Sequence, residues 1–297
     1  MKKPVRVILT GSTGLFGRAV LATVPPHYRI FPVYFHNPPL DQVHKFSRID
    51  ITKKQALRKF FDETQPDVVI HAASLGNVDY CERNPAEADL VNVSATHYIT
   101  DLCRGIGSRL IFTSSNAVFD GTSGPYSEDS PVHPVNHYGQ TKVLGERLVL
   151  SSPDNSVARF TLMYGWNNSD QRSNAVTWLL DKLRRGEEVK LVHDTYVNPV
   201  LNLQAASCVW RIITQNKTGI YHIAGRDRLN RYEFGLKTAR VFGFRPALLK
   251  PVPSNYFPGL AKRMPDTTFK TAKMESELHQ RPLTIMAGLK IMKHVGI

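Results

Sequence analysis

The sequence predicts an α/β fold, in which a doubly wound parallel sheet is followed by a smaller, mostly helical C-terminal lobe. Three observations predict it. The stretch Val5–Val20 passes from an apolar strand into a helical pattern through glycines 11, 14 and 17. Short apolar strand patterns then alternate with helical patterns up to residue 165, which favours parallel strands joined by crossover helices. Beyond residue 225 the helical patterns are short and repeatedly broken by proline. Together these features indicate a Rossmann-type sheet.

The glycines at the end of the first strand (Val5–Leu9) are the first functional signal. Glycine allows a tight strand-to-helix turn, close backbone approach to a pyrophosphate, and close packing of the helix on the sheet. The following helix would direct free N–H groups towards phosphate oxygens. An ordinary turn is the alternative, but the position between strand and helix disfavours it. The predicted cofactor contacts from this turn are Gly11, Thr13, Gly14, Leu15, Phe16 and Gly17.

The end of the second strand, Arg29–Phe35, bears on the type of cofactor. An acidic residue there would bind the adenosine ribose diol of NAD(H), whereas positive charge suits the 2′-phosphate of NADP(H). The sequence has no carboxylate at this point. We therefore predict NADP(H), with His36 and Arg18 as candidate phosphate partners and NAD(H) as an open alternative. For each of these two side chains, an ordinary surface position is an equal alternative.

Two further strand ends supply candidate cofactor contacts. A short strand at Arg48–Ile51 places Asp50 where it can accept from the adenine amine. After a helix at Gln55–Glu63, the strand Asp67–His71 ends in small residues, which would let ribose and phosphates lie against the backbone. Tight packing alone is the other explanation for them. The predicted contacts are Asp50, Ile51, Ala72, Ala73 and Ser74.

Catalytic chemistry is predicted further along the chain. A helix at Asp89–Cys103 precedes the strand Arg109–Ser114, after which Ser115 follows directly. Tyr138 and Lys142 share one face of the next helix because they lie four residues apart. A nearby ammonium should lower the pKa of the phenol, so that it exchanges a proton with a substrate oxygen, while the Ser115 hydroxyl binds the same oxygen. The pair is common by chance. Its combination with the glycine turn and the serine makes a catalytic site the better interpretation.

The remaining segments predict the domain organisation. Strands at Val157–Tyr164 and Gly219–Gly225 continue the sheet, whereas the helix Asn174–Arg185 and the proline-interrupted C-terminus do not. We expect a dinucleotide-binding domain at 1–165, to which 196–225 returns. Residues 166–195 and 226–297 should form a substrate-binding lobe that closes over the carboxyl ends of the strands.

Composition narrows the classes of function. The 297 residues are 42% hydrophobic, without an apolar run of about 18 residues or an apolar signal segment, so we expect no membrane span and a cytoplasmic location. The three cysteines lie far apart, which predicts neither disulfides nor a metal site. The net charge of +13 suits an anionic partner. Because the basic residues are scattered, we expect a nucleotide-bearing small molecule and no nucleic acid.

These motifs, in this order and spacing, resemble the extended short-chain dehydrogenase/reductase family. Within it the chain is most similar to the dTDP-4-dehydrorhamnose reductase group, through the pieces VDYCERNP, SSNAVFDG, PVNHYGQTKVLGE and GIYHIAG. The resemblance covers nearly the whole chain. It implies catalysis by Ser115, Tyr138 and Lys142, with the last two also contacting the cofactor, and substrate binding by Asn116, Asn174 and Arg263. Asn116-Ala117 and the stretch 195–199 depart from that group's pattern, which leaves the sugar undetermined.

The resemblance implies an NADP(H)-dependent reductase acting on the keto group of a nucleotide-linked deoxysugar. Two alternatives stay open. One is a nucleotide-sugar epimerase or dehydratase that retains its cofactor. The other is a non-catalytic, NADP-binding regulatory subunit, since the methionine adenosyltransferase beta subunit is similar to the same group. Homodimer formation also stays open.

Overall fold

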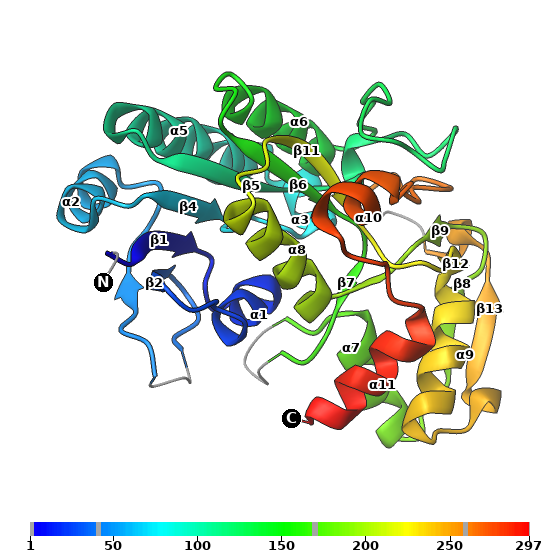
Figure 1. Cartoon of the computed structure of the whole chain (residues 1–297). Coiled ribbons are helices and arrows are strands. Elements are labelled where there is room, and N and C mark those ends of the chain that lie inside the picture. The colour runs from blue at the N-terminus through cyan, green and yellow to red at the C-terminus, as the bar shows by residue number, and fades with distance from the viewer. Residues whose placement is uncertain (1–2, 40–42, 168–171, 258–260, 297) are drawn as a thin grey trace.

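The computed structural model describes residues 3–39, 43–167, 172–257 and 261–296 (Figure 1). Its centre is a parallel sheet of seven strands in the order β11-β6-β5-β4-β1-β2-β3. This confirms the predicted doubly wound α/β class. The strands are β1 (Val5–Thr10), β2 (Tyr28–Tyr34), β3 (Ser47–Arg48), β4 (Val68–His71), β5 (Arg109–Ser115), β6 (Ser156–Phe160) and β11 (Gly219–Ile223).

Both faces of the sheet are buried by helices. Successive side chains of a strand point to opposite faces, and in β1 Val7 and Leu9 enter one apolar core while Ile8 enters the other. The first core is covered by α1 (Leu15–Ala22), α8 (Asn202–Thr214) and α10 (Ala272–Leu278). The second lies mainly under α2 (Lys54–Thr64) and α5 (Ala95–Ile106). Burial on both sides explains why these strands are nearly continuous apolar runs.

The segment between β4 and β6 carries the helices closest to the expected chemistry. They are α3 (Val78–Arg83), α4 (Pro85–Asp89), a π-helical turn at Leu90–Ser94 that joins α4 to α5, and α6 (His137–Val149). The helix predicted at Asp89–Cys103 is therefore real, but it contains a π-helical turn that the sequence pattern did not predict.

The predicted strand Val157–Tyr164 is wrong as a single element. Only β6 belongs to the main sheet. The last two residues form β7 (Met163–Tyr164), which pairs with β10 (Val200–Leu201) in a separate two-stranded sheet. The strand predicted at Arg48–Ile51 is also shorter, because β3 ends at Arg48 and the chain turns at Asp50.

The C-terminal part forms its own apolar cluster around α7 (Ala175–Arg184), α9 (Arg231–Phe242) and α11 (Ile285–Val295). Short strands complete it: β8 (Val189–Val192) pairs with β13 (Leu249–Val252), and β9 (Tyr196–Val197) with β12 (Leu229–Asn230). Helix α10 differs from the expected division, because its Met274 and Leu278 pack in the core of the main sheet.

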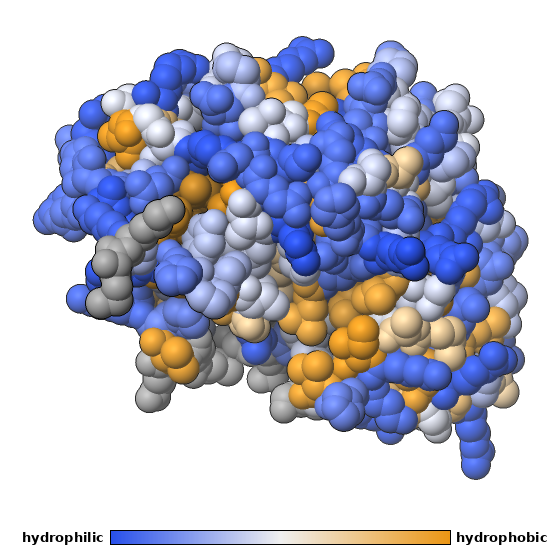
Figure 2. All heavy atoms as spheres, viewed as in Figure 1, coloured by the Kyte–Doolittle hydropathy of each residue, from blue (hydrophilic) through white to orange (hydrophobic). Residues whose placement is uncertain are grey.

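The viewed surface is mainly polar, except for an apolar area over the C-terminal part (Figure 2). Among the described residues, no helix is both long and apolar enough to cross a membrane.

Candidate active site

The glycine turn between β1 and α1 is packed too tightly for side chains. Gly11 has φ +68°, and a Cβ there would lie 2.7 Å from the Ala73 nitrogen. A Cβ on Gly17 would lie 2.3 Å from the Gly11 carbonyl oxygen. Only glycine fits both positions. The turn thus packs against the exit of β4 through Gly11 and against the start of α1 through Gly17.

A buried histidine fixes the exit of β4 beside this turn. Thr10 Oγ1 accepts the N–H groups of Ala72 and Ala73, each at 3.1 Å, so its own proton goes to Nδ1 of His71 at 2.8 Å. His71 Nε2 then donates to Thr96 Oγ1 at 3.0 Å, because the Thr96 hydroxyl itself donates to the Asn92 carbonyl. Burial and, secondarily, Lys142 lower the pKa of His71 to about 3. The ring is therefore neutral, and it links the cofactor side of the site to the π-helical turn.

The turn and α1 fit a dinucleotide phosphate. Gly14 caps α1 without a side-chain hydrogen bond and is exposed, so the first N–H groups of the helix face outward. The Nη1 atom of Arg18 is buried and has no hydrogen-bond partner among the described residues. A buried guanidinium nitrogen without a partner is costly, and a phosphate oxygen would satisfy it. Of the two predicted 2′-phosphate partners, Arg18 therefore has the stronger support.

The other predicted cofactor residues occupy varied surroundings. His36 is exposed, with its ring centre 4.2 Å from that of Phe35. Asp50 accepts the backbone N–H and the hydroxyl of Thr52 at 2.9 and 2.7 Å, both through Oδ1. This carboxylate thus stabilises the turn before α2, and its contact with adenine stays a prediction. Thr13, Phe16 and Ile51 are buried, whereas Leu15 and Ser74 are half-buried.

Ser115, Tyr138 and Lys142 come together at the carboxyl end of β5. Ser115 ends β5, and its hydroxyl, which donates to Asn116 Oδ1 at 3.3 Å, lies near enough to the Tyr138 phenol to lower the pKa of that phenol. Lys142 is 2% exposed, and its Nζ lies 5.7 Å from the centre of the Tyr138 ring. The Lys142 ammonium also donates to the Thr113 carbonyl at 3.1 Å. A hydroxyl, a phenol and an ammonium thus converge from two elements that are adjacent in the fold.

The expected effect of Lys142 on Tyr138 is wrong for this structure. Burial raises the pKa of Tyr138 to about 12, and the neighbouring Ser115 hydroxyl only partly opposes this increase. Burial also lowers the pKa of Lys142 to about 8, against the attraction of the Glu146 carboxylate. The ammonium lies over the Tyr138 ring and is held by the Thr113 carbonyl. The phenol therefore stays protonated near neutral pH, which is the form that a proton donor requires.

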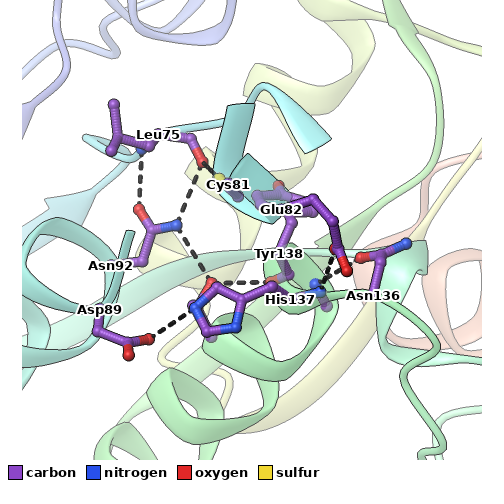
Figure 3. Close-up of polar contacts among 10 residues, drawn as sticks. Leu75, Cys81, Glu82, Asp89, Asn92, Asn136, His137 and Tyr138 are labelled. Atoms are coloured by element: carbon purple, nitrogen blue, oxygen red, sulfur yellow. Dashed lines mark hydrogen bonds and ion pairs between the residues drawn. The ribbon is translucent and has the colours of Figure 1, made fainter. Parts of the chain in front are cut away.

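The π-helical turn positions a side chain that sequence reasoning did not assign to the site (Figure 3). Asn92 is 1% exposed. Its Oδ1 accepts the Leu75 N–H at 2.8 Å, and its Nδ2 donates to the Leu75 carbonyl and to Thr141 Oγ1. Thr141 lies between Tyr138 and Lys142 and donates to the Tyr138 carbonyl. Asn92 thus fixes the catalytic helix to the loop after β4. The wider helical spacing that orients it has no clear sequence signal.

The three predicted substrate residues have different hydrogen-bond partners. Asn116 donates to Thr267 Oγ1 at 2.6 Å, directly beside Ser115. Asn174 caps α7: its Oδ1 accepts the N–H groups of Val176 and Thr177, and its Nδ2 donates to the Gly165 carbonyl. Its amide is therefore occupied by structural contacts. Arg263 lies on a segment next to α3, where its Nη2 donates to Asp79 at 2.6 Å.

A cavity of about 270 Å³ lies in the C-terminal part, between α7, β8 and α9. Its walls combine apolar side chains, among them Trp178, Leu191 and Phe257, with the basic Lys190 and Arg231. Burial and, secondarily, Arg263 lower the pKa of Arg231 to about 10, so the two guanidinium groups lie close enough to interact. Sequence reasoning missed this cavity, because its walls come from segments far apart in the chain.

Within the described parts of the chain, no three His, Cys, Asp or Glu side chains are grouped to hold a metal ion. Cys81, Cys103 and Cys208 are free and buried.

The family model of the RmlD substrate binding domain matches residues 5–294. The chain belongs to this family. This confirms the resemblance to dTDP-4-dehydrorhamnose reductases and, more broadly, to the NAD(P)-dependent reductases and epimerases of the extended short-chain dehydrogenase/reductase type.

Individual relatives of this RmlD-family chain have different functions. Methionine adenosyltransferase 2 subunit beta of Xenopus laevis is 33% identical over 256 residues, which cover 83% of this chain and 75% of that protein. A dTDP-4-keto-6-deoxy-D-glucose reductase of Streptomyces niveus is 28% identical over 257 residues, covering 86% and 84%. The fold of a Bacillus anthracis dTDP-4-dehydrorhamnose reductase, solved in complex with NADP, matches with a TM-score of 0.87 at 22% identity, covering 98% and 99% of the two chains.

Proposed function

We propose that this protein is an NADP(H)-dependent reductase of a 4-keto deoxysugar linked to a nucleotide. The proposal rests on the convergence of Ser115, Tyr138 and Lys142 at the end of β5, on the same edge of the sheet as the glycine turn. NAD(H) stays the alternative cofactor, and the unpaired Arg18 nitrogen favours NADP(H).

Each of the three side chains has a distinct part in this chemistry. Bound NADPH supplies the hydride. Tyr138, protonated near neutral pH, donates a proton to the substrate carbonyl oxygen as negative charge develops there. Ser115 hydrogen-bonds the same oxygen and stabilises that charge. The ammonium of Lys142 provides positive charge in a buried site, where electrostatic interactions are strong, and would hold the nicotinamide ribose.

The remaining part of the substrate would extend from Tyr138 towards the cavity beside α9. Aromatic and apolar walls suit a nucleoside base, and Arg231 and Arg263 suit a diphosphate. Asn116 donates to Thr267 and accepts from the Ser115 hydroxyl, and its position beside Ser115 would also bring it near the sugar hydroxyls. The contacts of Asn174 with the α7 backbone support an indirect role, in which it shapes α7.

Turnover with a purified substrate tests the proposal directly. The protein should oxidise NADPH stoichiometrically with dTDP-4-keto-6-deoxyglucose or its epimers, and the product should be the corresponding 4-hydroxy sugar. Isomerisation of the sugar nucleotide without net NADPH consumption would instead favour the epimerase alternative.

The identity with methionine adenosyltransferase 2 subunit beta favours a second candidate, a cofactor-binding regulatory subunit. A pull-down from the native host that captures a methionine adenosyltransferase, together with no NADPH oxidation on any keto sugar nucleotide, would favour this role. Turnover without such a partner would exclude it as the main function.

Three other expectations remain part of the proposal. They are the division into a dinucleotide-binding domain and a substrate lobe, with α10 reassigned to the former, a cytoplasmic setting, and the lack of a nucleic-acid partner, while homodimer formation stays open. Sedimentation, localisation of a tagged copy and an RNA-binding assay test them.

A further inference from the structure

Asp79 contacts residues 261 and 263 and so joins the dinucleotide-binding part of the chain to this C-terminal segment. It lies in the first turn of α3. Its Oδ1 accepts the Ala261 N–H at 2.8 Å, and its Oδ2 accepts from Arg263 Nη2 at 2.6 Å. One carboxylate therefore fixes both the backbone and the arginine side chain of this segment.

Arg263 keeps donors available for a second anion. Of its nitrogens, Nη2 is the one hydrogen-bonded within the described residues, which leaves Nε and Nη1 unused. Arg231 lies near enough to Arg263 to be repelled by it, and among the described residues it has no acidic partner. The Asp79 carboxylate thus pairs with one of two neighbouring guanidinium groups, and the charge of the other is not balanced by a described acidic group. The excess positive charge favours binding of an anion with several oxygens.

The position of this pair suits the middle of an extended ligand. Arg231 lines the cavity that would hold the base. On the other side, Asn136, the residue that caps α6 just before Tyr138, donates to the Lys262 carbonyl at 3.1 Å. Arg263 therefore neighbours both the start of the helix that carries Tyr138 and an arginine of the cavity wall, where the diphosphate of a nucleotide sugar would pass.

We propose that Asp79 is a positioning residue that holds Arg263 ready to bind the substrate diphosphate. The inference rests on the proposed function. Arginine loses substantial side-chain freedom when it is immobilised, so an arginine already held in place binds its ligand more tightly. Because the Arg263 side chain is 39% exposed, the ion pair itself contributes little to folding.

The test uses the full-length protein and the variant Asp79→Asn, which removes the charge and keeps the size. The probes are dTDP, UDP and the nucleosides thymidine and uridine, measured by calorimetry. We expect about a tenfold weaker affinity for the diphosphates, as one lost charge-assisted hydrogen bond implies. Affinity for the nucleosides and for NADP⁺ should stay within about twofold. With a turned-over sugar nucleotide, KM should rise and kcat should change little.

Two further variants make the result specific. Asp101→Asn removes a carboxylate that pairs with Arg104 on the exposed face of α5, away from the lobe, and should leave every affinity unchanged. In an Arg263→Ala background, Asp79→Asn should cause no additional loss of dTDP affinity. An unchanged dTDP affinity in Asp79→Asn, or an equally weakened thymidine affinity, would overturn this inference and leave the proposed function standing. A wild-type protein that binds neither diphosphate would overturn the proposed function as well.

Discussion

Replacing Tyr138 by phenylalanine tests the centre of the proposed mechanism. The substitution removes one hydroxyl and keeps the ring over which the Lys142 ammonium lies at 5.7 Å. General acid catalysis contributes about 10²–10⁴-fold, which corresponds to about 2.7–5.5 kcal/mol in the activation barrier. We expect kcat with a 4-keto sugar nucleotide to fall within that range. The loss should appear in kcat, because the phenol acts on charge that develops in the transition state.

Folding and cofactor binding should hardly change in the same variant. The phenol lies near the Ser115 hydroxyl, and loss of this polar neighbour should cost no more than about 1 kcal/mol, so Tm should fall by no more than about 2–4 °C. The assay follows NADPH absorbance for turnover and NADPH fluorescence for binding, with Asp101→Asn as the control. A reduction in kcat of less than tenfold, with binding intact, would show that Tyr138 does not supply the proton.

Three other perturbations have defined outcomes. Gly17→Ala places a Cβ 2.3 Å from the Gly11 carbonyl oxygen and should weaken NADP⁺ binding at least tenfold by calorimetry. The control is Gly105→Ala in α5, where no atom lies within 4 Å of the new Cβ. It should bind NADP⁺ normally and gain about 0.5–1 kcal/mol of stability. Lys142 has a pKa lowered to about 8, so its ammonium is present below that pH and lost above it. The kcat/KM and the NADPH affinity should therefore decline as pH rises through 8. The NADPH affinity of Lys142→Met should not show this decline. Arg18→Ala should weaken NADP⁺ about tenfold and leave NAD⁺ affinity unchanged; equal effects on both cofactors would show that the Arg18 guanidinium does not contact the 2′-phosphate.

The main features of the fold could be predicted because local sequence determines them. Alternation in β1 sends Val7 and Ile8 to opposite cores whatever the rest of the chain does. Likewise, the four-residue spacing of Tyr138 and Lys142 guarantees a shared helical face. The glycine turn was readable for a similar reason, since a positive φ at Gly11 and the backbone contact at Gly17 leave no alternative residue.

Two features of the site depend on contacts that the sequence pattern did not show. Asn174 stays a predicted substrate residue, and the free N–H groups of α7 lie next to it and occupy its amide oxygen. The helix predicted over 89–103 did exist. Its π-helical turn, which orients Asn92 towards Leu75, has no clear sequence signal.

By itself, then, the sequence determined which groups the protein has for its chemistry and the order in which strands and helices present them. The tertiary structure alone decided their ionisation and their distant partners. Burial reversed the expected direction of the Tyr138 pKa, and packing brought Asp79 next to Arg263, which lies 184 residues away. Both effects depend on desolvation and on contacts between segments remote in the chain, and no short stretch of sequence contains that information.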